Sequence, residues 1–492
     1  MTTRVRALTC FALSIALAVP SGAAPNPRDA SEENARIVHV LNRLGYGPRP
    51  GDVDAVRRMG VDAWIDRQLH PERIDDKAAA ARVRSLPTAT LDAEDLLEGY
   101  EIPRGAKRAI QKKRAEMGAD PKDADLQRAR RELIREYAGG MKGSPRQVLD
   151  ELQQAKVLRA VYGERQLDEV LVDFWMNHFN VFANKGPEKF LVGAFERDVI
   201  RPHAWGRFED LLLATAKSPA MLFYLDNWLS ADPNATTFFV RQRSRGLNEN
   251  YAREIMELHT LGVDGGYTQK DVTELARVLT GWTISGLRQG KPAFAFNARL
   301  HDRGDKTILG RRIKGGGMDE GEQVIHMLAT HPATARFVSL KLARRFVSDE
   351  PPPALVDRAA ETFRRTDGDL RAVVKAIVTS PEFFSPTARA AKVKTPLEFV
   401  ASAVRASGAE VTSARVLVQR IASMGMPLYQ QQPPTGYKDT ADAWVSTSGL
   451  LARMNFAADL ASGRLPGATA DPGSALLADA GVALGSPDFQ RR

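Results

Sequence analysis

Asn248-Glu-Asn-Tyr-Ala-Arg-Glu-Ile-Met-Glu-Leu-His-Thr-Leu-Gly262 is the stretch of sequence that decides the fold. Its large apolar residues fall on almost every side of a helical wheel: Ile255, Met256, Leu258, Leu261 and Val263. A helix that is apolar all round is normally buried, because no side of it can face water at low cost. This stretch therefore predicts a central helix with other helices packed around it.

Two acidic residues interrupt this apolar helix. Glu254 and Glu257 are three positions apart and share one helical face. Carboxylates carried into a core must form ion pairs, bind a cation or titrate at a higher pH. Four arginines could supply ion-pair partners: Arg253, Arg277, Arg344 and Arg345. A buried ion-pair network, an acid–base site and a metal site are therefore all open interpretations.

Helix start signals recur along the rest of the chain. Thr268 and Asp271 form a capping box ahead of a helix through Val278. A hydroxyl N-cap followed by proline at the first helical position marks a helix start. This pair occurs at Ser144-Pro145, Ser218-Pro219, Ser380-Pro381 and Thr395-Pro396.

Strand signals are confined to Ala293–Phe296 and Thr307–Leu309, with a turn at Asp302–Asp305 between them. We therefore predict a mainly α fold, a multi-helix globular body with a small β-hairpin insert near residues 290–315.

Residues 35–462 are expected to form a single large helical domain. Residues 35–69 contain two apolar-periodic segments separated by a glycine- and proline-rich loop. Residues 104–136 are about half charged, which predicts an exposed helical arm or hairpin. Residues 463–492 are expected to be a C-terminal tail.

The first 24 residues have the layout of a secretory signal peptide. Arg4 and Arg6 precede an uncharged apolar run, and small residues follow it, with cleavage expected near Ala23 or Ala24. The apolar run is too short to span a bilayer comfortably. We therefore expect a periplasmic or secreted protein with no membrane span in the mature chain, and a tether at residues 25–34.

Composition excludes several functional classes. The chain has 492 residues, 43% of them hydrophobic and 26% charged, as in ordinary globular proteins. Its only cysteine, Cys10, lies in the predicted signal peptide, which excludes disulfides and cysteine chemistry from the mature protein. Without Arg4 and Arg6 the formal net charge falls from +9 to +7. After export, this charge predicts contact with anionic glycans, with a membrane surface or with nothing in particular, and no nucleic acid.

A second stretch, Asp173-Phe-Trp-Met-Asn-His-Phe-Asn180, combines aromatic and polar residues. On a continuous helix Asp173, Asn177, Asn180 and Asn184 form one polar stripe, and helix interiors do not favour such residues. Trp175 joins this segment as a candidate substrate contact. His178 lies among aromatic residues, as a core histidine does, and is also a candidate catalytic group.

Further candidates are scattered along the chain. Tyr224 and Asp226 lie in one short motif, His301 in another, and Tyr437 and Trp444 form a predicted aromatic platform. Histidines and carboxylates at scattered positions could build a metal site, although no closely spaced histidine pair supports one. No phosphate-binding loop, dinucleotide fingerprint or serine nucleophile elbow is present. The cofactor is therefore unknown, and a divalent metal is the one candidate.

Several of these motifs resemble those of a bacterial family known as domain of unknown function 1800. The resemblance rests on Leu41-Asn-Arg-Leu-Gly-Tyr-Gly-Pro48, Phe174–Phe179, Tyr224–Asn227, the long run Asn248–Trp282, His301-Asp302, Lys341-Leu342 and Phe346-Val347. It covers about residues 35–456.

The resemblance implies an exported, mostly helical protein and suggests an exported sulfatase-like partner and an anionic or glycan substrate. The matched motifs add Asn248, Asn250, Tyr267 and Trp282 as candidate substrate contacts. One departure is Gly436-Tyr437, where the family pattern has Gly-Trp, so any contact of an indole N–H is lost.

Three functions are compatible with the sequence. The first is an exported hydrolase, acting on a glycan or another anionic envelope or extracellular substrate, with catalytic residues among Glu254, Glu257, Asp226, His178 and His301. The second is a non-enzymatic envelope binding or assembly protein that uses the charged arm. The third is a metalloenzyme with histidine and carboxylate ligands.

Overall fold

The computed structural model describes residues 27–118, 120, 123–235, 246–470 and 480–492. The predicted signal peptide and its cleavage site lie outside the described residues. The described chain is mainly helical, and its strands form three two-stranded antiparallel sheets. This confirms the predicted fold class.

The N-terminal part consists of short helices packed beside one another. Helix α1 begins at Pro27 and occupies most of the predicted tether, so the tether prediction was wrong there, because proline is tolerated in the first turn of a helix. Residues 35–69 form parts of three helices rather than two. The elements are α1 (Pro27–Arg43), α2 (Asp52–Met59), α3 (Val61–Gln68), η1 (Pro71–Arg73), α4 (Lys77–Arg84) and α5 (Ala93–Tyr100).

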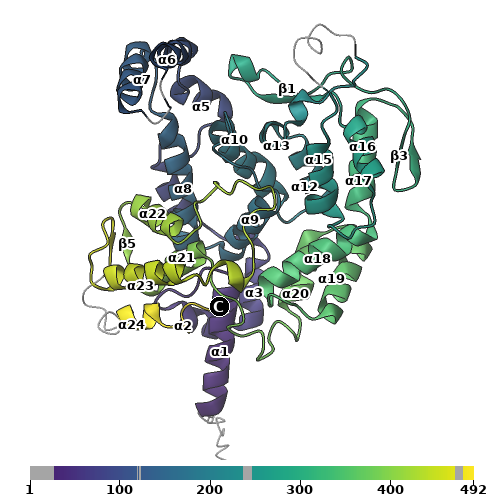
Figure 1. The fold of residues 1–492 in the computed structure, drawn as a ribbon. Coiled ribbons are helices and arrows are strands. Elements are labelled where there is room, and N and C mark those ends of the chain that lie inside the picture. Colours follow the sequence, from purple (N-terminus) through teal and green to yellow (C-terminus); the bar gives the residue numbers. More distant parts are fainter. Residues whose placement is uncertain (1–26, 119, 121–122, 236–245, 471–479) are drawn as a thin grey trace, which may run out of the picture.

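The charged segment forms a helical hairpin, as predicted. Helices α6 (Arg104–Met117) and α7 (Ala124–Tyr137) pack against each other and stand at one end of the molecule above α8 (Figure 1). Most of their residues are exposed, since each helix carries a single fully buried residue, Ala106 in α6 and Leu126 in α7. The charges are therefore largely in water.

The middle of the molecule is built from α8, α9 and α10 (Figure 1). Ser144 caps α8 through Gln147, and Pro145 and Pro219 each occupy the first position of a helix, as predicted. Helix α9 ends at His178, so the polar stripe leaves the helix before Asn180. The elements are α8 (Pro145–Tyr162), α9 (Gln166–His178), α10 (Glu188–Ala194), the π-helical turn η2 (Phe195–Ile200), α11 (Arg201–His203), α12 (Phe208–Ala216), α13 (Pro219–Tyr224) and η3 (Asn227–Leu229).

Residues 249–260 are helical, and the geometry changes from α-helical to π-helical at Ile255. Helix α15 (Glu249–Glu254) continues as the π-helical turn η4 (Ile255–Thr260), in which the Leu261 amide bonds to the Met256 carbonyl. Ile255 and Met256 are buried, as expected, whereas Val263 is 68% exposed. The segment is therefore not buried on all sides. Helix α16 (Gln269–Val278) follows and has the predicted capping box at Thr268 and Asp271.

Two hairpins replace the single predicted one. Strand β1 (Trp282–Ser285) pairs with β2 (Ala293–Phe296), and β3 (Lys306–Ile308) pairs with β4 (Arg311–Ile313). The predicted pairing of 293–296 with 307–309 was wrong, because each strand has a nearer partner across a tighter turn. The short helix η5 (Leu287–Gln289) lies in the first turn.

The C-terminal half lies on both sides of α9 in the view of Figure 1, with residues 332–378 at the right and residues 396–461 at the left. Thr395 caps α21 as predicted, whereas Ser380-Pro381 begins a series of turns and no helix. The elements are α17 (Met318–Ala329), α18 (Pro332–Phe346), α19 (Pro353–Arg365), α20 (Leu370–Val378), α21 (Pro396–Ala406), β5 (Glu410–Val411), α22 (Arg415–Ser423), η6 (Ala441–Ala443), α23 (Thr447–Ala461), β6 (Ala468–Thr469) and α24 (Ala480–Gly485).

The predicted C-terminal tail is partly built into the body. Strand β6 pairs with β5, and Lys392 and Arg492 exchange backbone hydrogen bonds. The Arg492 side chain is buried against Glu398, with 3.1 Å between Nη2 and Oε1. Residues 463–470 and 480–492 are therefore structural parts of the body. Arg492 in particular supplies a cation that the buried Glu398 carboxylate needs.

One large hydrophobic cluster extends from Ile37 to Leu484, and Trp175 and Trp282 are among its largest fully buried side chains. A small second cluster lies beneath the α6–α7 hairpin, around Tyr100 and Phe190. Among the described residues, no helix is both long and apolar enough to cross a bilayer.

Candidate functional site

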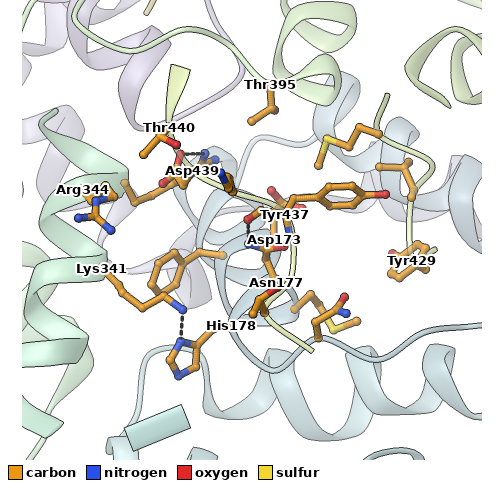
Figure 2. A pocket seen from close by; sticks show the side chains of 18 of the residues that line it. Asp173, Asn177, His178, Lys341, Arg344, Thr395, Tyr429, Tyr437, Asp439 and Thr440 are labelled. Carbon is orange, nitrogen blue, oxygen red and sulfur yellow. Dashed lines mark hydrogen bonds and ion pairs between the residues drawn. The ribbon is translucent and has the colours of Figure 1, made fainter. Parts of the chain in front are cut away.

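A cavity of about 370 Å³ lies between α9, α18 and the segment 426–444. Figure 2 shows side chains from these three parts of the chain around it. Its volume is within the range of ligand pockets, roughly 300–1,000 Å³. We call this cavity the Lys341 pocket, after the lysine on α18 that reaches one wall.

A lysine and a histidine meet at this wall. The Nζ of Lys341 lies 2.8 Å from the Nδ1 of His178, and the His178 Nε2 lies 3.1 Å from the carbonyl oxygen of His259. Because a carbonyl only accepts, Nε2 must carry the proton, and Nδ1 then accepts a hydrogen bond from the lysine. Burial, together with the charge of Lys341, holds the pKa of His178 well below its usual range. His178 is therefore a neutral acceptor.

The Lys341 ammonium lacks an acidic partner. Among the described residues no carboxylate lies within 4.0 Å of it, and Asp439 is the acidic group that affects it most. Desolvation lowers the pKa of Lys341 to about 8. A lysine with such a pKa can donate or accept a proton near neutral pH.

Two arginines on the next turn of α18 add positive charge to the pocket. Arg344 donates to the backbone carbonyl of Asp349 and has no carboxylate within 4.0 Å in the described chain. Arg345 is buried and pairs with Glu398 at 2.7 Å, yet its Nε and Nη2 have no partner among the described residues. The wall formed by α18 is therefore cationic.

The acidic residues of the pocket are already neutralised. Asp173 forms an ion pair with Lys156, 2.7 Å from Oδ1 to Nζ. Asp439 lies 3.2 Å from the buried Lys392. With these pairs satisfied, Lys341 and Arg344 are the charges left to meet a ligand.

Three asparagines hold the opposite wall in place. Asn177 accepts from the Tyr437 amide at 2.7 Å and donates to the Tyr437 carbonyl at 2.8 Å. Asn180 donates to the carbonyls of Gln431 and Pro433, and Asn184 donates to the Gln430 side chain. The polar stripe predicted from sequence thus anchors residues 430–437, even though α9 ends within it.

A glycine allows this wall to approach α9 closely. Gly436 has φ +69°, and a Cβ on it would lie 2.4 Å from the Asn177 carbonyl oxygen. Tyr437 and Trp444 follow, with ring centroids 5.9 Å apart, which confirms that these two residues are neighbours. Burial raises the pKa of Tyr437, whose hydroxyl donates to the Pro427 carbonyl.

Glu254 and Glu257 lie elsewhere, on α15 and η4, and line none of the described cavities. Burial and the nearby Glu257 raise the pKa of Glu254 to about 7. Glu257 accepts a hydrogen bond from the Tyr267 hydroxyl at 3.0 Å.

The four arginines proposed as partners for this pair are engaged with other groups. Arg253 approaches Glu249, Arg277 binds Glu274 and Asp302, and Arg345 binds Glu398. Of the three interpretations of Glu254 and Glu257 left open by the sequence, the buried ion-pair network is therefore contradicted, and both acids remain partly exposed to water.

Four other candidates lie at the end of α13, in the turn after it and at the start of α15. Asp226 adopts φ +60° and pairs with Lys185 at 2.7 Å. Tyr224 donates to the Gln432 carbonyl at 2.5 Å. Asn248 caps α15 by accepting from the Asn250 amide, and the Asn250 side chain is exposed.

The remaining candidates are buried in the body. The His301 Nε2 lies 2.5 Å from Glu320, which also pairs with Lys306. Trp282 is fully buried, and Trp175 is fully buried with its indole donating to the Ala204 carbonyl. The structure thus brings together Asp173, Asn177, His178, Tyr437 and Trp444, and it places the other candidates outside the pocket.

Sequence reasoning missed the cations of the pocket as site residues. Lys341, Arg344 and Arg345 lie within five residues of α18, and basic residues spaced among Leu342, Ala343 and Phe346 are a usable signal. Among the described residues, no group of three or more His, Cys, Asp or Glu side chains could hold a metal ion.

Comparison with curated proteins and with solved structures finds no match. The sequence model of one family, described as protein of unknown function (DUF1800), matches residues 39–490. That match covers nearly all of the described chain, including every residue of the Lys341 pocket. The chain therefore belongs to the DUF1800 family.

Proposed function

We propose that the protein binds the anionic group of its ligand in the Lys341 pocket, and that it does so outside the cytoplasm, after the export that its N-terminal sequence predicts. The observation that carries this proposal is the pair of cations, Lys341 and Arg344, that face a ligand-sized cavity without an acidic partner in the described chain. A desolvated cation without a counter-ion binds anions more strongly than one in water.

The pocket also has an aromatic side and a proton donor. Tyr437 and Trp444 provide apolar surface beside the cations. The neutral His178 accepts a hydrogen bond from Lys341 and so orients its ammonium group. With a pKa of about 8, this ammonium can protonate a leaving group near neutral pH. The arrangement is compatible with hydrolysis of an anionic substrate as well as with binding alone.

Calorimetric titration with sulfate, acetate and glucuronate tests the binding proposal. We expect at least one of these anions to bind the protein and to lose about tenfold or more in affinity in Lys341→Met. Lys341→Arg should retain binding, because it keeps the charge. Lys270→Met is the matched control, because Lys270 is an exposed cation outside the pocket. Equal affinity in Lys341→Met and in the control variant would refute the proposal.

Hydrolysis by the Glu254–Glu257 pair is a second candidate, favoured by one observation. The pKa of Glu254 is raised to about 7 by burial and by Glu257, so Glu254 can hold a proton near neutral pH and act as a general acid. On a hydrolytic activity found by screening, Glu254→Gln and Glu257→Gln should each lower kcat at least about 100-fold. Full activity in both folded variants removes this candidate.

A further inference from the structure

A second cavity, of about 750 Å³, lies where the α6–α7 hairpin meets the start of α8. We call it the hairpin-base pocket. Its apolar lining includes Ile102, Ile134 and Leu149. Four basic side chains also line it, namely Arg130, Lys142, Arg146 and Lys189, and Asp150 is the single acidic residue among them.

The positive charge of this pocket is not neutralised within the described chain. Asp150 is shared, because the Arg146 Nε lies 3.7 Å and the Arg415 Nη2 3.5 Å from its Oδ2. Arg130, Lys142 and Lys189 have no described carboxylate within 4.0 Å. Like-charged side chains around one cavity repel each other, and a multivalent anion relieves that repulsion.

The same charge continues onto the hairpin. Helix α6 carries six basic residues and one acidic residue, and α7 carries four basic and three acidic residues. Both helices are largely exposed. The positively charged surface is therefore larger than a single small anion would cover.

The two cavities meet at one loop. Tyr429 lines the Lys341 pocket, and the next residue, Gln430, lines the hairpin-base pocket. On the facing segment, Asn180 lines the first cavity and Asn184 the second. The hydrogen bond from Asn184 to Gln430, 2.9 Å long, fixes the loop at the point between them.

We infer that the two cavities bind successive charged sugars of one anionic polysaccharide. The inference rests on the proposed function, because the Lys341 pocket holds the first charged sugar. A polysaccharide fits because two aromatic side chains, Tyr437 and Trp444, line the cavity beside cations for a carboxylate or sulfate. Aromatic side chains can pack against the apolar face of a sugar ring. The hairpin-base pocket then receives a charged sugar further along the same chain.

Two linked sites predict affinity that depends on ligand length. A short oligosaccharide can occupy one cavity only, whereas a longer one that reaches both binds its second site as an intramolecular event. We expect a chondroitin sulfate decasaccharide to bind at least about tenfold more tightly than the disaccharide, a minimum set below the roughly 100-fold or larger gain that two linked sites can give. Basic side chains on the hairpin should add to this difference at low salt.

The test measures binding of the chondroitin sulfate disaccharide and decasaccharide by calorimetry at 0.15 M salt. The Debye length is then roughly 8 Å, so charges within the pockets still attract the ligand. In Lys142→Met/Arg146→Met we expect the decasaccharide to lose its advantage and the disaccharide to bind as in the unmodified protein. Lys270→Met/Arg365→Met is the charge-matched control, since both residues are exposed and line neither pocket. It should leave both affinities unchanged.

Three results would overturn the inference. The first is an equal decasaccharide affinity in Lys142→Met/Arg146→Met and in the control. The second is loss of disaccharide binding in Lys142→Met/Arg146→Met, which would place the first sugar in the wrong pocket. The third is tighter binding of a single-stranded DNA oligonucleotide of equal charge, which would exclude a polysaccharide as the preferred ligand. Failure of the proposed function is distinct, because it appears as disaccharide binding that Lys341→Met does not weaken.

Discussion

The Nζ of Lys341 and the Nδ1 of His178 are 2.8 Å apart, and the histidine is held neutral by burial and by the lysine charge. The pair connects α18 to α9 across the floor of the pocket. Because the histidine can only accept here, the proton that titrates near neutral pH is on the lysine.

Anion binding in the Lys341 pocket should weaken as the pH rises. The pKa of Lys341 is lowered to about 8, so the free protein loses the ammonium charge above that pH. Affinity should fall up to about tenfold for each further pH unit. Titration calorimetry from pH 7 to 10 at constant ionic strength measures this. Lys341→Arg should show little pH dependence, and a steep fall in that variant would contradict the assignment.

Glu254→Gln should stabilise the protein at alkaline pH. The raised pKa of Glu254, about 7, means that the folded state holds a proton between pH 4.5 and 7 that the unfolded chain releases. Stability therefore falls across this range in the unmodified protein. The variant should be more stable at pH 8 by about 1 kcal/mol, a value reduced for partial exposure. Urea unfolding at pH 5 and pH 8 tests this.

The exposed Glu98 on α5 supplies the control, because it has no ion pair among the described residues. Glu98→Gln should leave the pH dependence unchanged. If Glu254→Gln and Glu98→Gln give the same difference between pH 5 and pH 8, the raised pKa is refuted.

Gly436→Ala should loosen the loop that closes the pocket. The substitution places a Cβ 2.4 Å from the Asn177 carbonyl oxygen in a left-handed conformation. Gly463→Ala is a close control, because Gly463 has φ +67° and open space around it. Both variants incur roughly 1 kcal/mol of backbone strain. Only Gly436→Ala should lose more stability and weaken anion binding, and equal behaviour of the two would show that the close approach is unimportant.

Glu398→Gln should be strongly destabilising. Glu398 is buried between Arg345 at 2.7 Å and Arg492 at 3.1 Å, and removal of one partner from a buried ion pair costs about 3–5 kcal/mol. Burial alone would raise the pKa of Glu398, but the two arginines lower it to about 2. This stabilisation is complete above pH 4.5 and is lost as the pH falls through about 2.

Chemical denaturation measures the effect of Glu398→Gln, with Glu382→Gln as the control. Glu382 pairs with Arg358 at the surface, so its loss should cost less than about 1 kcal/mol. A comparable small loss in Glu398→Gln would mean that Arg492 does not need this carboxylate.

Patterns within single segments predicted much of the fold. The mainly α class, the helical hairpin at 104–136 and the caps at Ser144, Thr268 and Thr395 all follow from local sequence. Strand pairing was predicted wrongly, because β2 meets β1 rather than a later strand. Pairing depends on which partner lies nearest in space, and periodicity does not record that.

The candidate site was predicted only in part, because its residues come from segments that are distant in sequence. The need of Asn177 and Asn180 for partners was visible in sequence, and the identity of those partners, residues 431–437, was not. His301 seemed equally suited to chemistry, yet its neighbour Glu320 lies nineteen positions away in sequence. Lys341 and Arg344 were not proposed as ligand-binding residues, because basic residues near the end of a helix are common on solvated surfaces.

The pocket draws its floor from α9, one wall from α18 and the other from residues 426–444. These parts are made in that order, so a chain growing from its N-terminus has the histidine and the lysine long before the loop that encloses them. The pocket is therefore complete only after residues 426–444 have been made and folded against α9 and α18.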